Sequence, residues 1–422
     1  MARIEMRPKA WLRAAALALA ALTSSGGAQA QDAIFGRDTF KGMAEIRWAG
    51  TDGERSWVQG GFGKSAVPGG GDGWRGAAGL SQAVVEWRPR IGFGISAVVS
   101  GQWQADTHPK LDLDEAFLKL KAPPRPYGRL SGRVGYFYPP VSLEHGGVGW
   151  TTSDLLTASA LNSWIGEEVK VAGAELSFEH RFGDHEVTAT GAVFGWNDTS
   201  GALVSFRGWS LHGVRTGVQT EFSLPPLTPF LTRHQDDGTY PAWEIDNRPG
   251  YYARLEWRPP APVALSAFHY DNRGDRTSVR DLQWAWETRF TSVSALWTPD
   301  QATRLRAQAL AGRTWMGFSR PETWVDVGFR AAYLMATRDV GPGALSLRLD
   351  AFDAHDHTLR KLDAADEHGW AITGGWRQPL AAWADLFLEA QQIDSKRPGR
   401  TLAGDAPKQD ETVLQTAVRL HF

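Results

Sequence analysis

The stretch that decides the fold is Thr412-Val-Leu-Gln-Thr-Ala-Val-Arg-Leu-His-Phe422, the last eleven residues of the 422-residue sequence. Successive side chains of a β-strand point to opposite faces, so this stretch sorts into two rows. One row is largely apolar and consists of Leu414, Thr416, Val418, Leu420 and Phe422. The other row is more polar and includes Gln415, Arg419 and His421. The pattern predicts a strand with one apolar and one polar face.

This strand ends in Phe422, with Leu420 and Val418 two and four positions earlier. Such an ending resembles the assembly signal of bacterial outer-membrane β-barrels. The alternative is an ordinary terminal strand of a soluble sheet. We predict that Val418, Leu420 and Phe422 face outer-membrane lipid and serve as a signal to the barrel-assembly machinery.

Stretches in which apolar and polar residues alternate recur along the chain, for example at 83–88, 325–333 and 345–351. A soluble antiparallel sheet alternates in the same way, but with its apolar face inward. A transmembrane barrel places the apolar row toward lipid and the polar row toward its lumen. No run of about 18 apolar residues is present to form a transmembrane helix. The sequence therefore predicts an all-β, antiparallel transmembrane barrel.

The lengths of the connections indicate the strand count. Seven short connections alternate with eight longer polar stretches, and bacterial barrels have short periplasmic turns and long external loops. This alternation predicts sixteen strands with both ends on the periplasmic side. Two further segments, 43–50 and 214–223, also look like strands, so eighteen strands is the alternative. The long stretches are 64–79, 104–111, 139–166, 197–249, 271–281, 317–323, 356–367 and 395–409.

The first thirty residues are typical of a secretory signal peptide. A basic lead that includes Arg3 and Arg13 precedes an apolar run at 14–22, and Ala28-Gln29-Ala30 fits a cleavage site. We expect export and insertion into the outer membrane of a Gram-negative cell. The expected organisation is a signal peptide at 1–30, an N-terminal periplasmic segment or extra strand at 31–54, and the barrel at 55–422.

Composition excludes several classes of function. The chain has no cysteine, which excludes disulfides and thiolate chemistry, and its formal charge of −2 gives no reason to expect nucleic acid as a partner. It contains 20 tryptophans, a residue that suits the lipid–water interface. The His355-Asp356-His357 motif lacks a third ligand nearby in sequence. We predict no metal and no cofactor.

A local resemblance to a known family lies at about 110–145. Leu113-Asp-Glu-Ala-Phe-Leu118, Arg133-Val-Gly-Tyr-Phe-Tyr-Pro-Pro140 and Leu143-Glu144 resemble the phosphate- and polyphosphate-selective porins. The remainder of the chain agrees with that family in architecture. The resemblance implies a sixteen-stranded diffusion channel, usually a homotrimer, that is narrowed by a loop folded into the lumen.

The long loop at about 139–166 is the best candidate for that constriction. Its apolar residues need burial, which favours a loop inside the barrel over an exposed external loop. We predict that acidic side chains of this region line the narrowest point. They are Glu144, Asp154, Glu167 and Glu168.

Arginines recur on the polar faces of the later strands. Lipid-facing arginine costs about 2–4 kcal/mol at the membrane midplane, so these side chains should face the lumen. They either guide anions or form a structural lattice with acidic neighbours such as Asp326 and Asp350. The predicted pore-lining residues are Arg254, Arg258, Arg304, Arg306, Arg330, Arg348, Arg419, Glu115 and Glu256.

These observations predict a porin, that is, a passive channel for small hydrophilic or anionic solutes with a modest anion preference, and no enzyme. Two alternatives remain. One is a phospholipase-like barrel enzyme, although no Ser–His spacing singles out a catalytic set. The other is a non-conducting adhesin or structural barrel.

Overall fold

The computed structural model describes residues 34–318, 323–358 and 365–422. The predicted signal peptide lies outside these residues. Most of the described chain is β-strand, and the long strands form one closed antiparallel sheet in which each strand pairs with its sequence neighbour. Pairing of the first and last strands closes the ring, with Glu45 opposite Arg419 and Ile46 opposite Val418. In the described part of the chain, no helix is both long enough and apolar enough to cross a bilayer.

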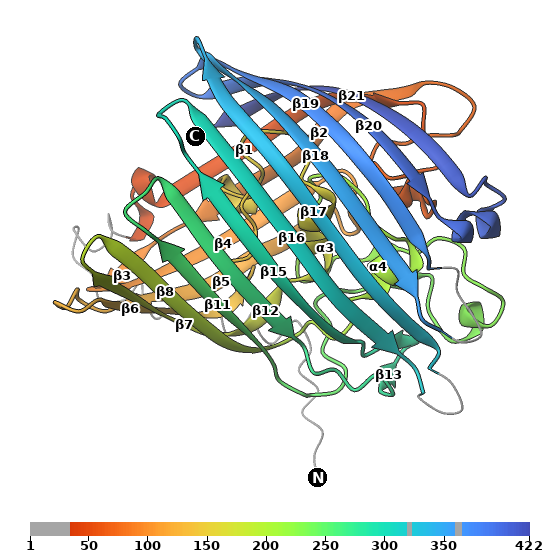
Figure 1. Cartoon of the computed structure of the whole chain (residues 1–422), viewed down its shortest axis with the longest axis horizontal. Coiled ribbons are helices and arrows are strands. Elements are labelled where there is room, and N and C mark those ends of the chain that lie inside the picture. The colour runs from red at the N-terminus through yellow and green to blue at the C-terminus, as the bar shows by residue number, and fades with distance from the viewer. Residues whose placement is uncertain (1–33, 319–322, 359–364) are drawn as a thin grey trace.

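The barrel wall contains sixteen strands, as predicted. Figure 1 shows the wall strands as long tilted ribbons that enclose loops and short helices. Their bounds are β1 Phe40–Thr51, β2 Arg75–Trp87, β4 Ile95–Gln104, β5 Leu111–Lys121, β6 Arg129–Phe137, β7 Val171–Phe182, β8 His185–Gly195, β11 Gly250–Arg258, β12 Val263–Asp271, β15 Glu287–Trp297, β16 Thr303–Met316, β17 Val325–Val340, β18 Gly343–Asp356, β19 Glu367–Ala381, β20 Ala384–Lys396 and β21 Lys408–His421.

The remaining elements are short and lie in turns and loops. The α-helices with bounds inside the described residues are α3 Ala160–Glu168 and α4 Ala202–Phe206. The minor strands are β3 Arg90–Gly92 in the turn before β4, β9 Phe222–Ser223, β10 Gly238–Thr239, β13 Val279–Arg280 and β14 Gln283–Trp284. The 3₁₀ turns are η1 Arg37–Thr39, η2 Trp57–Gln59, η3 Val148–Trp150, η4 Leu231–Arg233 and η5 Pro398–Ala403.

Of the two expectations for 31–54, a periplasmic segment or an extra strand, the structure contains a strand. The wall begins at Phe40 rather than at residue 55, because the strand-like segment 43–50 lies in β1. Its alternation is weak, since outward Gly42 and Ala44 are small and inward Met43 is apolar. The other strand-like segment, 214–223, contributes no wall strand and overlaps only the two-residue β9. The alternative of eighteen strands is therefore wrong.

The outer surface of the wall is apolar. Large side chains such as Leu176 on β7, Val193 on β8 and Leu334 on β17 are exposed there. Their strand neighbours in the inward row are mostly buried or half-buried. A barrel that presents an apolar outer band matches the hydrocarbon core of a membrane.

Two long connections fold into the barrel, and Figure 1 shows their helices α3 and α4 inside the ring of strands. We call residues 138–170, between β6 and β7, the first inward loop, and residues 196–249, between β8 and β11, the second inward loop. Residues 154–170 are all buried, and so are 197–217 except for half-buried Gly213. The first inward loop covers the region at about 139–166 that the sequence analysis expects to fold into the lumen.

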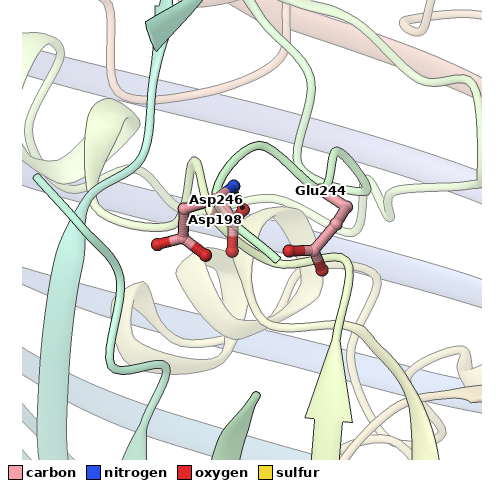
Figure 2. A group of neighbouring side chains, drawn as sticks. All are labelled: Asp198, Glu244 and Asp246. Carbon is pink, nitrogen blue, oxygen red and sulfur yellow. Dashed lines mark hydrogen bonds between the residues drawn. The ribbon is translucent and has the colours of Figure 1, made fainter. Parts of the chain in front are cut away.

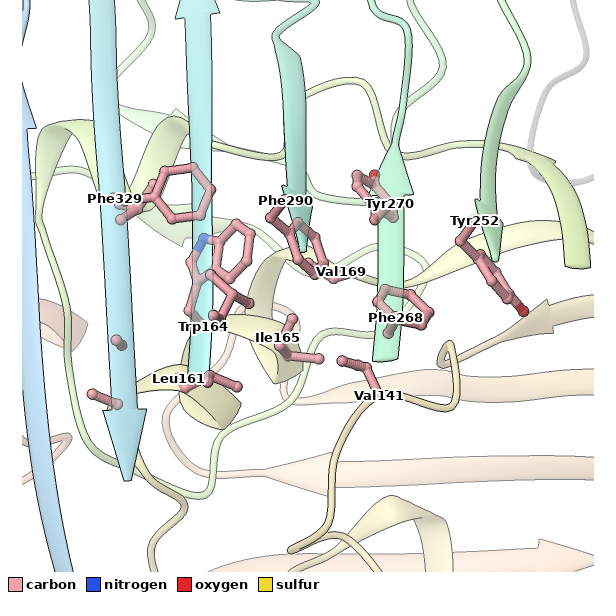
Figure 3. Packing of buried hydrophobic residues seen from close by; sticks show 14 of the residues in the cluster. Val141, Leu161, Trp164, Ile165, Val169, Tyr252, Phe268, Tyr270, Phe290 and Phe329 are labelled. Carbon is pink, nitrogen blue, oxygen red and sulfur yellow. The ribbon is translucent and has the colours of Figure 1, made fainter. Parts of the chain in front are cut away.

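Apolar contacts attach α3 to one side of the inner wall (Figure 3). The Trp164 ring packs against Phe290 and Phe329, with ring centroids 5.3 and 5.0 Å away. Leu161 and Ile165 belong to the same buried cluster. Burying a large side chain of this kind contributes about 1.5–3 kcal/mol, so this cluster is a main reason why the loop stays inside.

Candidate functional site

The candidate site is the barrel lumen, where the inward loops meet the wall. The first inward loop is organised locally by Glu144 and by the start of α3. Ser159 caps the helix by accepting the Asn162 backbone N–H at 3.2 Å, and its own hydroxyl donates to Glu144. Glu144 also accepts from the Asn162 side chain. Glu144, which the sequence analysis places at the constriction, therefore stabilises the fold of its own loop.

A buried ionic network joins this loop to strand β18. Arg348 donates to Glu144 at 3.1 Å and to Asp350 at 2.8 Å. It also donates to the carbonyl oxygens of Thr157 and Ala158 at 2.7 and 3.0 Å. Its guanidinium is fully buried, so Arg348 lies on the inner wall as predicted but anchors the loop to it.

Asp154 is the contact between the first inward loop and strand β16. Arg306 lies 2.8 Å from its carboxylate, and Arg304 lies 3.5 Å away. Arg304 also pairs with Asp339 at 3.0 Å. Both arginines retain some exposure, unlike Arg348, so they lie where the lumen wall is still open to water.

Glu167 and Glu168 end α3 and turn toward the second inward loop rather than toward an open passage. Glu167 accepts two hydrogen bonds of 2.7 Å from Arg207, and these lower its pKa to about 2. Glu168 accepts from Trp164 and from the backbone N–H groups of Gly201 and Leu203. Burial without a paired cation raises the pKa of Glu168 to about 7. Both carboxylates thus join the two loops.

Each of the remaining predicted wall residues has its own set of hydrogen-bond and ionic partners. On β11, Glu256 lies between Arg254, which contacts it, and the more exposed Arg258 at 2.7 Å. On β21, Arg419 is buried and bonds to Glu45 at 2.6 Å and to the Thr152 carbonyl at 2.6 Å.

Glu115 on β5 is also buried, and it accepts the backbone N–H of Tyr138 at 3.0 Å. These residues lie on the inner side of the wall, and each has a protein partner there. That arrangement agrees with the structural lattice left open by the sequence.

Arg330 is the exception, because it points away from the lumen. Its side chain is 73 % exposed and pairs with Asp353 at 3.2 Å on the outer surface. On β17 the apolar row, which includes Phe329, faces inward because it packs against Trp164. The prediction that Arg330 lines the pore is therefore wrong. Its position near the external end of β17 places the charge where lipid exposure costs only about 0–1 kcal/mol.

The terminal strand has the predicted orientation. Val418 and Leu420 belong to the outward row of β21, and Arg419 belongs to the inward row. Phe422 follows the strand and is 74 % exposed. Its backbone exchanges hydrogen bonds with Gly42 at 3.0 and 3.2 Å, which joins it to the first strand.

Three carboxylates meet in the second inward loop, which the sequence analysis did not anticipate. Figure 2 shows Asp198, Glu244 and Asp246, whose nearest oxygens lie within 4.8 Å of one another. Burial and the charge of Glu244 raise the pKa of Asp198 to about 7. Asp198 accepts the backbone N–H of Asp246 at 3.0 Å, and Glu244 accepts that of Trp196 at 2.9 Å. By accepting these backbone hydrogen bonds, Asp198 and Glu244 stabilise the fold of the second inward loop.

Sequence reasoning missed several further lumen residues that loops contribute. Lys64 pairs with Glu367, while burial lowers the pKa of this lysine to about 8. Lys170 lies 2.6 Å from Asp114, and Arg215 sits against β2 and β4. Loop residues have no periodicity to show their direction. The apolar residues scattered through 202–214 were the available sign that this polar stretch needs burial.

Three solved structures resemble this barrel over most of its length. The outer membrane channel DcaP of Acinetobacter baumannii matches with a TM-score of 0.58 and 11 % identity, over 91 % of this chain and 96 % of that chain. The anion-selective porin from Comamonas acidovorans matches with a TM-score of 0.53 and 13 % identity, over 91 % of this chain and 99 % of that chain. A loop-deletion mutant of OmpT, an outer membrane protein of Vibrio cholerae, matches with a TM-score of 0.53 and 10 % identity, over 91 % of this chain and 99 % of that chain.

No protein-family model matches the sequence, and neither does any curated protein. At such low identities the structural matches establish the fold alone. The chain therefore has the closed, sixteen-stranded barrel fold found in outer-membrane porins.

Proposed function

We propose that this protein is an outer-membrane porin, a passive channel for small hydrophilic solutes. The observation that carries the proposal is the first inward loop, which is fixed to the inner wall through Glu144 and Arg348. A sixteen-stranded barrel otherwise encloses a wide aqueous channel. A loop that is anchored to the wall narrows this channel to a fixed passage, which suits selective diffusion.

The two inward loops make the passage much narrower than the bare barrel. Contacts run from the two loops to different parts of the wall: Ala160 donates to Asp350 on β18, whereas Arg215 donates to Gln82 on β2. Both loops are buried over long stretches. We therefore expect a small conductance and a low size limit for neutral solutes.

We further propose a modest anion preference. Arg304 and Arg306 retain exposure in the lumen, and arginine keeps its charge at any physiological pH. Asp154 offsets part of that charge, and salt screens the remainder over about 8 Å. The expected preference is therefore weak.

Location and assembly form part of the same proposal. The apolar outer band fits an outer-membrane location, and Val418, Leu420 and Phe422 suit contact with the barrel-assembly machinery and lipid. Cleavage of the signal peptide after Ala30 and a homotrimeric state follow from the sequence expectations. N-terminal sequencing and chemical cross-linking test these two points. The enzyme and adhesin alternatives have no specific observation in their favour.

Swelling of proteoliposomes tests the channel proposal. Liposomes that contain the folded protein should swell at rates that fall steeply with the size of the external neutral sugar. A heat-denatured sample of the same protein is the control. Swelling no faster than with empty liposomes, from protein with a verified β-sheet spectrum, would contradict the proposal.

A further inference from the structure

The outer face of the barrel wall carries an arginine near the external end of each of three neighbouring strands. They are Arg289 on β15, Arg313 on β16 and Arg330 on β17. On β15, the adjacent Thr288 and Phe290 are buried on the inner side, whereas Arg289 is exposed on the outer side. A charged side chain on the lipid-facing surface of a barrel is costly at the membrane centre and tolerated only near its edges.

Arg289 and Arg313 lie directly opposite each other on adjacent antiparallel strands. Like charges in this position destabilise a sheet unless something else compensates them. Both guanidinium groups lie over the ring of Trp315, at 4.7 Å from its centroid for Arg289 and 5.2 Å for Arg313. Trp315 is only 8 % exposed, although it belongs to the outer face. One aromatic side chain therefore holds two cations side by side.

The two arginines differ in their acidic partners. Arg313 donates to both oxygens of Asp326, at 2.7 and 2.8 Å. Arg289 has no carboxylate within 4.0 Å and no hydrogen-bond acceptor among the described residues. Asp271 lies opposite it on β12, but the Arg289 guanidinium turns the other way, toward β16, and Glu287 on its own strand does not reach it either. Its five N–H donors are thus left for a group outside the described protein.

Two outward tryptophans show how high on the wall this pair of arginines lies. Trp297 is exposed at the periplasmic end of β15, and Trp315 lies opposite Glu287, ten residues earlier on that strand. Ten residues span roughly 33 Å of strand, or about 25 Å of height at a tilt of about 40°. The apolar band of a transmembrane barrel is about 25 Å tall, with aromatic residues at both edges. Trp315 and the Arg289 guanidinium therefore lie at the external edge of the band, where lipid headgroups begin.

We propose that Arg289, together with Arg313, binds the phosphate of a membrane lipid headgroup in the external leaflet. Arg289 donates two N–H groups to two phosphate oxygens, the forked arrangement in which arginine recognises phosphate, and Arg313 adds a second positive charge. The expected occupant is a lipid rather than a dissolved ion, because the site lies on the surface that faces the membrane and outside the lumen. This inference rests on the proposed outer-membrane location and adds a binding surface to it.

The test is lipid binding by the full-length barrel in a neutral detergent, measured by native mass spectrometry. Phosphatidic acid, which carries a phosphate monoester, should bind at least tenfold more tightly than phosphatidylcholine, whose phosphate is neutralised by its choline group. In Arg289→Gln this preference should fall at least fivefold. Arg289→Lys, which keeps the charge but loses the fork, should give an intermediate preference.

Arg338→Gln is the matched control. Arg338 is also an exposed arginine of the outer row of β17, but it lies at the periplasmic end and pairs with Asp300 at 3.6 Å. This variant should keep the wild-type preference for phosphatidic acid. Equal losses in Arg338→Gln and Arg289→Gln would reduce the effect to net charge and overturn the site.

Inorganic phosphate, added at the same concentration as the lipid, separates a lipid site from a site for a free ion. It should leave the binding of phosphatidic acid unchanged, and displacement of the lipid would overturn the proposal. An unchanged preference in Arg289→Gln would overturn it as well. If that variant does not give a heat-modifiable barrel, Arg289→Lys decides in its place, and an unchanged preference there would count against the fork.

Conductance distinguishes this inference from the channel proposal. Arg289→Gln should conduct as wild type does, because the site lies outside the lumen. A wild type that prefers phosphatidic acid but does not conduct would overturn the channel function and leave the lipid site standing. A wild type that conducts but shows no preference for phosphatidic acid would overturn the lipid site alone.

Discussion

Arg348 on strand β18 and Glu144 in the first inward loop form a buried ion pair, with 3.1 Å between Nη1 and Oε1. The two residues are 204 positions apart in the sequence, so the pair connects the loop to a distant part of the wall. Asp350 and two loop carbonyls complete the coordination of the guanidinium. The position of the constriction therefore depends on this arginine.

Replacement of Arg348 by Met should release the first inward loop. The change leaves two buried carboxylates, those of Glu144 and Asp350, without their cation. Breaking one partner of a buried pair costs about 3–5 kcal/mol. We expect a larger and noisier single-channel conductance and faster proteolysis within 142–158.

Arg330→Met is the control for this variant, since it removes an arginine of the adjacent strand from an exposed pair on the outer surface. Such pairs contribute at most about 1 kcal/mol. An Arg348→Met channel with wild-type conductance and wild-type proteolysis would show that apolar packing around Trp164 alone positions the loop.

The anion preference should depend on Arg304 and Arg306. Reversing both charges, as Arg304→Glu with Arg306→Glu, removes two partners of Asp154 and adds negative charge to the lumen. We expect the chloride-to-potassium permeability ratio to fall by roughly two- to fivefold, because partly exposed pairs contribute about 0.2–1 kcal/mol. The reversal potential across a KCl gradient measures this ratio.

The control for this pair is Arg304→Lys with Arg306→Lys, which keeps both charges. Its ratio should stay near the wild-type value. A wild type that prefers cations would refute the anion preference, and an unchanged ratio in the double glutamate variant would make these arginines structural partners only.

Docking of the first inward loop should weaken as the pH rises toward 7. Burial raises the pKa of Glu168 to about 7 from an ordinary value of 4.5, so the docked loop keeps a proton that the released loop loses. Its contribution is therefore fully present below about pH 4.5 and declines as the pH rises through 7, by on the order of 3 kcal/mol. Proteolysis of the loop in detergent should accelerate from pH 5 to pH 8.

Glu168→Gln should remove this pH dependence, because the amide does not titrate. Glu167, whose pKa is lowered to about 2, stays ionised throughout the same range and does not contribute to the slope. The same rate increase in wild type and in Glu168→Gln would assign the effect to another group.

Phe422→Ala should impair assembly and leave conductance unchanged. The Phe422 ring lies against Gly42 of the first strand, so close that a Cβ on that glycine would come within 2 Å of it. The variant should yield less heat-modifiable barrel in outer-membrane fractions, while the barrels that do assemble should conduct as wild type does. Phe93→Ala, an exposed aromatic at a periplasmic turn, controls for loss of apolar surface. Wild-type levels of folded Phe422→Ala would remove the assembly role.

The alternation of short and long connections predicted the number of strands, and periodicity predicted which side chains of most wall strands point outward, because each wall strand has one apolar outer face. The row of Val418 and Leu420 illustrates this, since its outward direction followed from alternation alone. Periodicity marked 43–50 as strand-like but did not place it in the wall, because small residues such as Gly42 and Ala44 give little contrast between the two faces of β1. It also failed for Arg330, because the inner wall of β17 is apolar where it meets Trp164.

The sequence predicted the direction in which most charged side chains point, but not the partners with which they pair. Arg348 and Arg419 were expected on the inner wall and are found there, but their partners come from loops that carry no periodic signal. Arg215 was not anticipated for the same reason. The path of the two inward loops through the lumen decides which cation pairs with which carboxylate.

Single-channel recording of the purified wild-type protein in planar bilayers tests the central claim most directly. We predict discrete current steps of one small, reproducible size in KCl, which increase in Arg348→Met as the first inward loop is released. Protein that is folded by heat-modifiability and circular dichroism, yet inserts into the bilayer without any current steps, would contradict the account of this barrel as a loop-narrowed diffusion channel.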